Sequence, residues 1–212
     1  MHELITTPAG DARITRFPAP ARKRRAVLAL GHGAGGGIAA PDLQALAAAL
    51  PADGIEVVLI EQPWVVAGKK IAPAPKTLDA GWLPAAEAVR KSSARKTPFL
   101  VGGRSAGARV ACRTGAATGA TGIVALAFPL HPPGKPEKSR AEELTDTGLP
   151  TLVVQGATDP FGTPAEFPKL PPTHRLIGLP AGDHGFKTKK SEEPVLEGLV
   201  AAVSEWIGGL VR

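Results

Sequence analysis

Short apolar runs alternate with segments of helical periodicity along most of this chain. Compact apolar runs, which predict buried strands, centre near residues 28, 58, 100, 126, 153 and 177. Helical patterns fall between most of them, at about 41–50, 79–95, 106–117 and 193–208. A hairpin of two strands, Leu4–Thr7 and Ala12–Phe17, is predicted before them. This alternation favours the α/β class, with a mainly parallel sheet of roughly eight strands and helices on both faces.

The length of the chain favours a single domain over residues 1–212. Its 212 residues lie within the single-domain range, and no internal repeat is visible. Hydrophobic residues make up 43% and charged residues 21%, which excludes general disorder. The connection from Pro129 to Pro150 holds only about twenty residues, as short-loop statistics favour. We therefore expect no inserted lid domain.

The same composition indicates a cytoplasmic protein without membrane attachment. No apolar segment has membrane-spanning length, and the amino-terminal residues lack the pattern of an export signal. The single cysteine, Cys112, cannot form an intrachain disulfide, which is compatible with a reducing compartment. It is expected to be a small buried hydrophobic residue.

A Gly-x-Ser-x-Gly motif, Gly103-Arg104-Ser105-Ala106-Gly107, lies between an apolar strand pattern and a small-residue helix pattern. In this context the motif is typical of a nucleophile elbow, a tight turn that lifts the serine hydroxyl clear of the backbone. The flanking glycines are needed where a Cβ would collide with the adjoining strand and helix. An ordinary strand-to-helix turn is the alternative in a chain with 25 glycines. Ser105 is therefore a candidate nucleophile.

A candidate acid and a candidate base follow Ser105 in the order that this elbow requires. Asp159 comes after the strand pattern at 151–154, and His184 comes after the strand pattern at 175–179. Asp183 is a weaker candidate for the acid, because adjacent residues on an extended loop point apart. Asp146 precedes a strand and so lies at the wrong edge of the sheet. The order predicts a catalytic triad of Ser105, Asp159 and His184.

A glycine-rich bend follows the strand pattern at 26–30 and includes Gly31-His32-Gly33-Ala34-Gly35. Such a bend is where hydrolases with this elbow place one N–H of the oxyanion hole, and the residue after the nucleophile supplies the other. We assign these donors to Ala34, with Gly35 as the close competitor, and to Ala106. A dinucleotide site, with Glu61 near the ribose-binding position, is the disfavoured alternative. We expect no cofactor and no metal.

Three further residues are candidates for contact with a substrate. His131 opens a proline-rich loop expected at the rim of the site, although a structural role is commoner for such a histidine. Trp64 could form an apolar wall, although core packing is at least as common for a tryptophan. Arg104 flanks the elbow and could orient an acidic group, whereas a salt-bridged arginine is the commoner outcome.

The formal charge of +6 and the pI near 9.7 leave the class of partner open to two interpretations. Basic residues cluster at 22–25 and at Lys187, Lys189 and Lys190, just past His184. The second cluster could attract an anionic small-molecule substrate, although solvated surface charge is the favoured interpretation. Nucleic acid is not expected as a partner, because no recognition motif is visible and aromatic residues make up only 4%. No feature indicates an oligomeric state.

Five blocks of sequence resemble the small lidless α/β-hydrolases described as dienelactone-hydrolase-like. They are Gly-His-Gly-Ala-Gly-Gly, Gly-Gly-Arg-Ser-Ala-Gly-Ala-Arg-Val, Phe-Pro-Leu-His-Pro-Pro-Gly-Lys-Pro, Val-Gln-Gly-x-x-Asp-Pro-Phe-Gly and Gly-Asp-His-Gly-Phe. The resemblance is closest to the branch that includes the hydrolase-like domains of testis-expressed and chromatin-regulatory proteins. It implies Ser105 as nucleophile, Asp159 as acid and His184 as base. Dienelactone hydrolases proper carry cysteine at the elbow, so their substrate is not carried over.

Two functions follow as hypotheses. The favoured one is a serine hydrolase of the carboxylic-ester type that cleaves small esters, thioesters or lactones through an acyl-enzyme. The alternative is a catalytically silent binding protein that retains the fold, because a fold alone does not prove turnover. A lipase is disfavoured, because the chain has no lid and few aromatic residues for a broad acyl groove.

Overall fold

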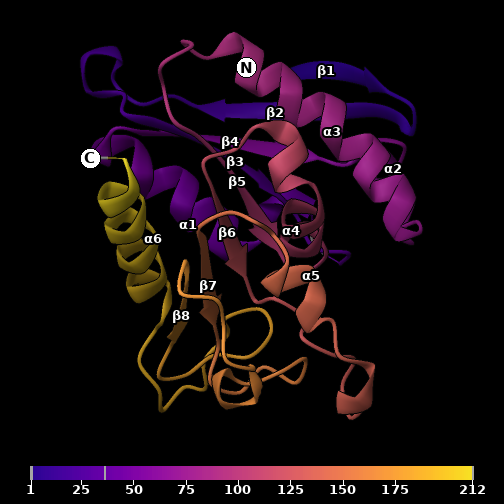
Figure 1. The fold of residues 1–212 in the computed structure, drawn as a ribbon, viewed down its shortest axis with the longest axis vertical. Helices are drawn as coiled ribbons and strands as arrows, with labels where there is room; N and C mark the ends of the chain where they lie inside the picture. The colour runs from indigo at the N-terminus through magenta and orange to yellow at the C-terminus, as the bar shows by residue number, and fades with distance from the viewer. Residues whose placement is uncertain (1, 36, 212) are drawn as a thin grey trace.

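A single sheet of eight strands runs through the centre of the molecule, with helices on both of its faces (Figure 1). The computed structural model describes residues 2–35 and 37–211, so Gly36 of the glycine-rich bend lies outside the described residues. The strand order is β1-β2-β4-β3-β5-β6-β7-β8. This architecture confirms the predicted α/β class and the predicted mainly parallel sheet.

The sheet is antiparallel at one edge and parallel everywhere else. From β1 to β8 its strands are His2–Thr7, Gly10–Phe17, Ala26–Gly31, Ile55–Glu61, Phe99–Arg104, Gly122–Leu126, Thr151–Gln155 and His174–Gly178. β1 pairs with β2, and β2 with β4, in antiparallel register, whereas all pairs from β4 to β8 are parallel. The central strands are buried on both faces, which explains why they read as continuous apolar runs.

The helices differ widely in length. From α1 to α6 they are Pro41–Ala49, Pro63–Val66, Pro75–Ser92, Ala106–Thr118, Ala141–Thr145 and Leu196–Leu210. Short 3-10 helices, η1 to η5, lie at Ala21–Lys23, Gly37–Ala39, Leu50–Asp53, Pro136–Lys138 and Pro164–Glu166. The four long helices were predicted within a few residues, whereas α2 and α5 are too short to show a helical period.

Two hydrophobic layers hold these helices against the sheet (Figure 1). α1 and α6 pack on one face, where Leu46 of α1 and Val203 of α6 are fully buried. α3 and α4 pack on the other face, with Trp82 and Val110 in its core. Cys112 belongs to this second layer, and burial raises the pKa of its thiol. It is the small buried hydrophobic residue that the sequence predicted.

β3, β5 and α4 approach one another closely where Ser105 is displayed. A Cβ on Gly107 would lie 2.6 Å from the backbone carbonyl of Gly31, and one on Gly103 would lie 2.6 Å from the same oxygen. Any side chain at these two positions would force the strand and the helix apart. The two glycines of the motif therefore allow the start of α4 to pack directly against the backbone of β3.

The connection between β6 and β7 contains η4 and α5, and within residues 127–150 the structure shows no inserted lid domain. His131 anchors this connection and is 5% exposed. Its N–H donates to the carbonyl of Phe161 at 3.0 Å. Its ring nitrogens face two acceptors, Nδ1 the carbonyl of Pro132 at 3.0 Å and Nε2 the Glu166 Oε1 at 3.0 Å. Both ring nitrogens can therefore donate when the imidazole is protonated.

These contacts change how His131 and Glu166 bind protons. The carbonyl of Pro132 raises the pKa of His131, burial opposes this, and the Glu166 carboxylate raises it further. The N–H and the hydroxyl of Thr163, followed by His131, lower the pKa of Glu166. A raised folded pKa means that the stability from His131 is complete below about pH 6.5 and is lost as the pH rises through the folded pKa.

Replacing Glu166 with glutamine tests this pairing, because E166Q keeps the side-chain shape and removes the charge. We expect a loss in the free energy of unfolding below about 1 kcal/mol, since the Glu166 side chain is 44% exposed. The loss should be largest between about pH 5 and 6.5 and shrink as the pH rises to about 8. Urea unfolding of both proteins across this range measures it, and a loss that grows with pH contradicts the pairing.

Candidate active site

Ser105 occupies a strained turn between β5 and α4. Its backbone has φ 53° and ψ −112°, a conformation that residues with a Cβ rarely adopt. Its N–H donates to the carbonyl of Leu126 at 2.9 Å, which ties the turn to the end of β6. The close approach at Gly103 and Gly107 fixes the turn from the other side. Ser105 therefore has the nucleophile-elbow geometry that the motif predicted.

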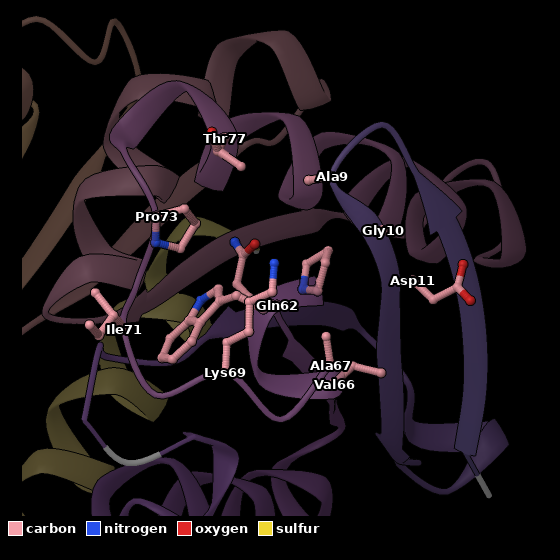
Figure 2. A pocket seen from close by; sticks show the side chains of 12 residues that line it. Ala9, Gly10, Asp11, Gln62, Val66, Ala67, Lys69, Ile71, Pro73 and Thr77 are labelled. Carbon is pink, nitrogen blue, oxygen red and sulfur yellow. The ribbon is translucent and has the colours of Figure 1, made fainter.

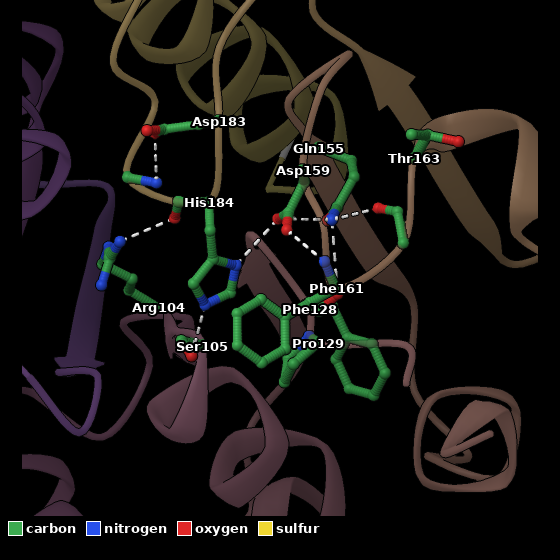
Figure 3. Close-up of polar contacts among 12 residues, drawn as sticks. Arg104, Ser105, Phe128, Pro129, Gln155, Asp159, Phe161, Thr163, Asp183 and His184 are labelled. Atoms are coloured by element: carbon green, nitrogen blue, oxygen red, sulfur yellow. Dashed lines mark hydrogen bonds and ion pairs between the residues drawn. The ribbon is translucent and has the colours of Figure 1, made fainter. Parts of the chain in front are cut away.

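The His184 ring lies between the Ser105 hydroxyl and the Asp159 carboxylate (Figure 3). Its Nδ1 is 2.8 Å from Asp159 Oδ2, and its Nε2 is 2.8 Å from Ser105 Oγ. A carboxylate accepts hydrogen bonds, so Nδ1 carries the proton and Nε2 is free to accept from the hydroxyl. The fold thus brings together the three residues that the order of the motifs selected. In the sequence, His184 lies 25 positions from Asp159 and 79 positions from Ser105.

Asp159 is 1% exposed, and neighbouring donors compensate its burial. Besides His184, the N–H of Phe161 donates to Oδ1 at 2.8 Å and Gln155 Nε2 donates to Oδ2 at 2.8 Å (Figure 3). The loop that carries Asp159 also bonds to the loop that carries His184, since the N–H of Thr158 donates to the carbonyl of Gly182 at 3.0 Å. Asp159 and His184 are therefore positioned as one unit.

Two further contacts orient His184. The ring of Phe161 lies against the imidazole, with centroids 4.2 Å apart and an angle of 33° between the planes. Asp183 Oδ1 accepts from the N–H groups of Gly185 at 2.7 Å and Lys187 at 3.0 Å. Asp183 therefore shapes the loop around His184, and Asp159 holds the ring.

The proposed oxyanion donors lie on two segments that meet beside Ser105. Ala106 is the first residue of α4, so its N–H has no acceptor within the helix. Ala34 follows β3, and both residues line a cavity of about 10 Å³, close to the volume that one water occupies. Gly35 does not line this cavity, so of the two candidates in the bend Ala34 is the one that shares a cavity with Ala106.

His32 holds the glycine-rich bend in place. The ring is buried, its Nδ1 is 2.8 Å from the carbonyl of Gly33, and its Nε2 accepts from the N–H of Gln62 at 3.0 Å. Burial lowers the pKa of His32, against the opposing effects of the Gly33 carbonyl and Glu61. A neutral ring with the proton on Nδ1 satisfies both contacts, so His32 joins the bend to the end of β4.

Arg104 contacts the protein, and this replaces its interpretation as a residue that orients substrate. Its Nη2 donates to the carbonyl of His184 at 2.6 Å. Its Nε lies 3.3 Å from Asp42 Oδ2, close enough for an ion pair but without hydrogen-bond geometry. Burial raises the pKa of Asp42, and the charge of Arg104 opposes this. Arg104 therefore links the elbow, α1 and the loop of His184.

The other two substrate candidates have different outcomes. His131 is buried with both ring nitrogens engaged, so its interpretation as a substrate contact is replaced by the anchoring role described above. Trp64 is 8% exposed and lines the small cavity together with Ala34 and Ala106. Trp64 also belongs to the lining of a cavity of about 360 Å³, and Figure 2 shows Gln62, Pro73 and Thr77 around that cavity. Gln62 and Trp64 line both cavities.

The basic clusters lie at opposite edges of the sheet. Arg24 and Arg25 precede β3 at the amino edge, where Arg24 pairs with Glu56 at 3.1 Å. Lys187, Lys189 and Lys190 are not buried and follow His184 at the carboxyl edge. Only the second cluster is therefore near the candidate site.

A larger groove of about 670 Å³ lies between α1 and α6. Its lining includes none of Ser105, Asp159 and His184.

Gln155, Phe161 and His32 support the site, although the motifs alone did not single them out. Gln155 and Phe161 lie inside the Val-Gln-Gly-x-x-Asp-Pro-Phe-Gly block, and His32 lies inside the glycine-rich bend.

Among residues 2–35 and 37–211, no group of three or more His, Cys, Asp or Glu is placed to hold a metal ion. In the same residues, no helix is both long enough and apolar enough to cross a membrane.

Solved structures of similar fold include several hydrolases. XC6422 from Xanthomonas campestris, an α/β serine hydrolase without a lid, is 21% identical with a TM-score of 0.73, over 97% of this chain and 94% of that one. An α/β serine hydrolase homologue from Coxiella burnetii is 17% identical with a TM-score of 0.74, over 100% and 96%. Est1E from Butyrivibrio proteoclasticus, solved with ferulic acid bound, is 13% identical with a TM-score of 0.74, over 99% of each chain.

At these identities the likeness shows the fold alone. No curated protein matches the chain. The family model of the alpha/beta hydrolase domain matches residues 24–211, which is nearly the whole sequence. The strand order, the absence of a lid in the connection after β6 and this match agree. The chain therefore belongs to the alpha/beta hydrolase family.

Proposed function

We propose that this protein is a serine hydrolase that cleaves small ester, thioester or lactone substrates through an acyl-enzyme. The observation that carries the proposal is the chain of two 2.8 Å contacts from Ser105 through His184 to Asp159. Membership of the alpha/beta hydrolase family supports it. The proposed nucleophile, base and acid are Ser105, His184 and Asp159.

The first step is attack of Ser105 Oγ on the carbonyl carbon of the substrate. A neutral hydroxyl is a weak nucleophile, so His184 Nε2 takes its proton as the oxygen–carbon bond forms. The imidazolium that results is stabilised by the buried Asp159 carboxylate, which also keeps the proton on Nδ1 before the attack. The contact between Ser105 and His184 is already at hydrogen-bond distance, so no loop movement is needed.

The negative charge on the carbonyl oxygen is proposed to be held by the N–H groups of Ala34 and Ala106. Both residues line the same small cavity beside the elbow. The amino-terminal end of α4 points at this position and adds the positive end of its dipole. These donors act most strongly on charge that develops in the transition state, which is where acyl transfer needs them.

The tetrahedral intermediate then collapses and the bond to the leaving group breaks. His184 returns its proton to the departing oxygen or sulfur, which leaves the acyl group on Ser105. A water molecule attacks this acyl group, again with His184 as base, and Ser105 is released with its proton. These steps balance without a metal or an organic cofactor.

The surroundings of the site favour a small acyl group and an anionic substrate. The cavity beside the oxyanion donors has a volume of about 10 Å³, and Trp64 is one of the residues that line it. The lysines that follow His184 place positive charge at the same edge of the sheet. We therefore favour short acyl chains, and carboxylate groups elsewhere in the substrate.

Replacing Ser105 with alanine tests the nucleophile directly. We expect S105A to lose hydrolysis of p-nitrophenyl acetate by at least roughly 10³-fold, because the attacking oxygen is removed. A fluorophosphonate probe, which bonds to an activated serine and releases fluoride, should label the wild type and leave S105A unlabelled. Mass spectrometry of the labelled peptide locates the adduct.

Equal labelling of both proteins would overturn Ser105 as nucleophile. A wild type that neither takes up the probe nor hydrolyses a panel of short and long p-nitrophenyl esters would favour the silent binding protein instead. The variant N-terminal to the elbow, Gly102→Ala, is not a suitable control, because a Cβ there would collide with the backbone of Val124. Ser204→Ala on α6 is the matched control, because this half-buried serine donates to Asp53 and contacts none of the three proposed catalytic residues within residues 2–35 and 37–211.

Replacing Trp64 with alanine tests the limit on acyl length. Trp64 lines both the cavity of about 10 Å³ and the cavity of about 360 Å³, so removing its indole should open space for longer acyl chains. We expect W64A to raise the ratio of kcat/KM for p-nitrophenyl hexanoate over acetate by roughly 10-fold, and W64F to lie between W64A and the wild type. An unchanged ratio in W64A would show that the acyl group lies elsewhere.

A further inference from the structure

Gln155, the last residue of β7, lies directly behind the Asp159 carboxylate (Figure 3). Its side chain is fully buried. Its Nε2 lies 2.8 Å from Asp159 Oδ2, 2.8 Å from the carbonyl of Gly162 and 3.4 Å from the carbonyl of Phe128. The mechanism above makes no use of this amide.

The surroundings of Gln155 determine which way the amide points. Nε2 faces one carboxylate oxygen and two carbonyl oxygens, all of which only accept hydrogen bonds. The Gln155 Oε1 is buried and has no partner among the described residues. A flipped amide would set this oxygen against the same acceptors. The amide therefore donates to Asp159, at the cost of leaving its own oxygen without a hydrogen bond.

The oxygen that Gln155 contacts is the one that holds His184. Oδ2 of Asp159 accepts from Gln155 Nε2 and from His184 Nδ1, each at 2.8 Å, while Oδ1 accepts from the N–H of Phe161. Within residues 2–35 and 37–211, His184 is the one side chain of basic type within ion-pair distance of Asp159. Gln155 is thus the neutral side chain that compensates the buried carboxylate and fixes the direction of Oδ2.

The same amide also fixes the turn that follows the acid. Gly162 closes this turn, since its N–H donates to the carbonyl of Asp159 at 3.1 Å and its carbonyl accepts from Gln155. Phe161, which lies against the His184 ring, is part of the turn. One buried amide therefore holds both the carboxylate and the aromatic ring that contact His184.

We propose that Gln155 is a positioning residue of this hydrolase, which sets the orientation of the Asp159 carboxylate by a donated hydrogen bond. This inference rests on the proposed function, because it concerns the same three residues. Gln155 touches no reacting atom, so its removal should slow the chemical step and leave binding unchanged.

The test compares Q155M and Q155E with the wild type, by the rate at which a fluorophosphonate probe labels Ser105 between about pH 6 and 9. Q155M removes the donor at nearly constant volume, so we expect the maximal labelling rate to fall roughly 10- to 100-fold with the half-saturating probe concentration unchanged. This fall should be the same at every pH.

Q155E supplies the signature that a merely structural role would not give. At alkaline pH the introduced carboxylate faces Asp159 and repels it, so labelling should be slower than in Q155M. As the pH falls, the introduced carboxyl takes up a proton and can donate where the amide did. The ratio of the Q155E rate to the wild-type rate should therefore rise toward acidic pH.

Two exposed-site variants are the matched controls. Gln44 lies on the solvent face of α1, so Q44M and Q44E make the same chemical changes away from Asp159. Both should label at the wild-type rate at every pH. Circular dichroism shows whether each protein is folded. If Q155M does not fold, the pH dependence of the Q155E labelling rate decides the test.

The outcomes separate this inference from the proposed function. If the wild type is labelled at Ser105, and Q155M and Q155E are labelled at the same rate as the wild type, the role of Gln155 is overturned. The proposed function then remains intact. A Q155E rate that stays a constant fraction of the wild-type rate at all pH values would also overturn it. A wild type that is not labelled would overturn the proposed function itself.

Discussion

The buried carboxylate of Asp159 is the constraint around which the candidate site is organised. An ionised group out of contact with water is costly unless hydrogen bonds replace its hydration. Three donors do so, and they come from the end of β7, from the turn after it and from the loop after β8. Satisfying this one group therefore fixes two loops and the ring of His184 relative to one another.

A second constraint fixes Ser105 from the opposite side. The missing side chains at Gly103 and Gly107 let α4 start against the backbone of Gly31, and the serine between them takes a strained conformation. Arg104 then joins this turn to the carbonyl of His184 and to the buried Asp42. The elbow and the loop of His184 thus share a link that does not pass through the side chains of Ser105, His184 and Asp159.

Much of the fold could be predicted because its physical causes are local in the sequence. Strands buried on both faces leave continuous apolar runs, and the long helices leave a 3.6-residue period, so both were found within a few residues. Ser105, Asp159 and His184 could be selected because parallel strands deliver their following loops to one edge. α2 and α5 were missed because four and five residues are too few to show a period.

The partners of several buried polar side chains could not be predicted from the sequence. For Arg104 and His131 a structural role was the commoner expectation, but nothing local in the sequence shows that Asp42 and Glu166 lie beside them. Gln155 likewise reads as an ordinary polar residue at a strand end, and its function depends on a carboxylate four positions away that folds back over it. Such pairings depend on tertiary packing, which periodicity does not encode.

The most direct test of this account is a crystal structure of the protein after reaction with a fluorophosphonate. We expect phosphorus bonded to Ser105 Oγ, one phosphonyl oxygen within hydrogen-bond distance of the N–H groups of Ala34 and Ala106, and His184 still paired with Asp159. An adduct on another residue, or a phosphonyl oxygen directed away from both amides with the His184 ring separated from Asp159, would contradict it.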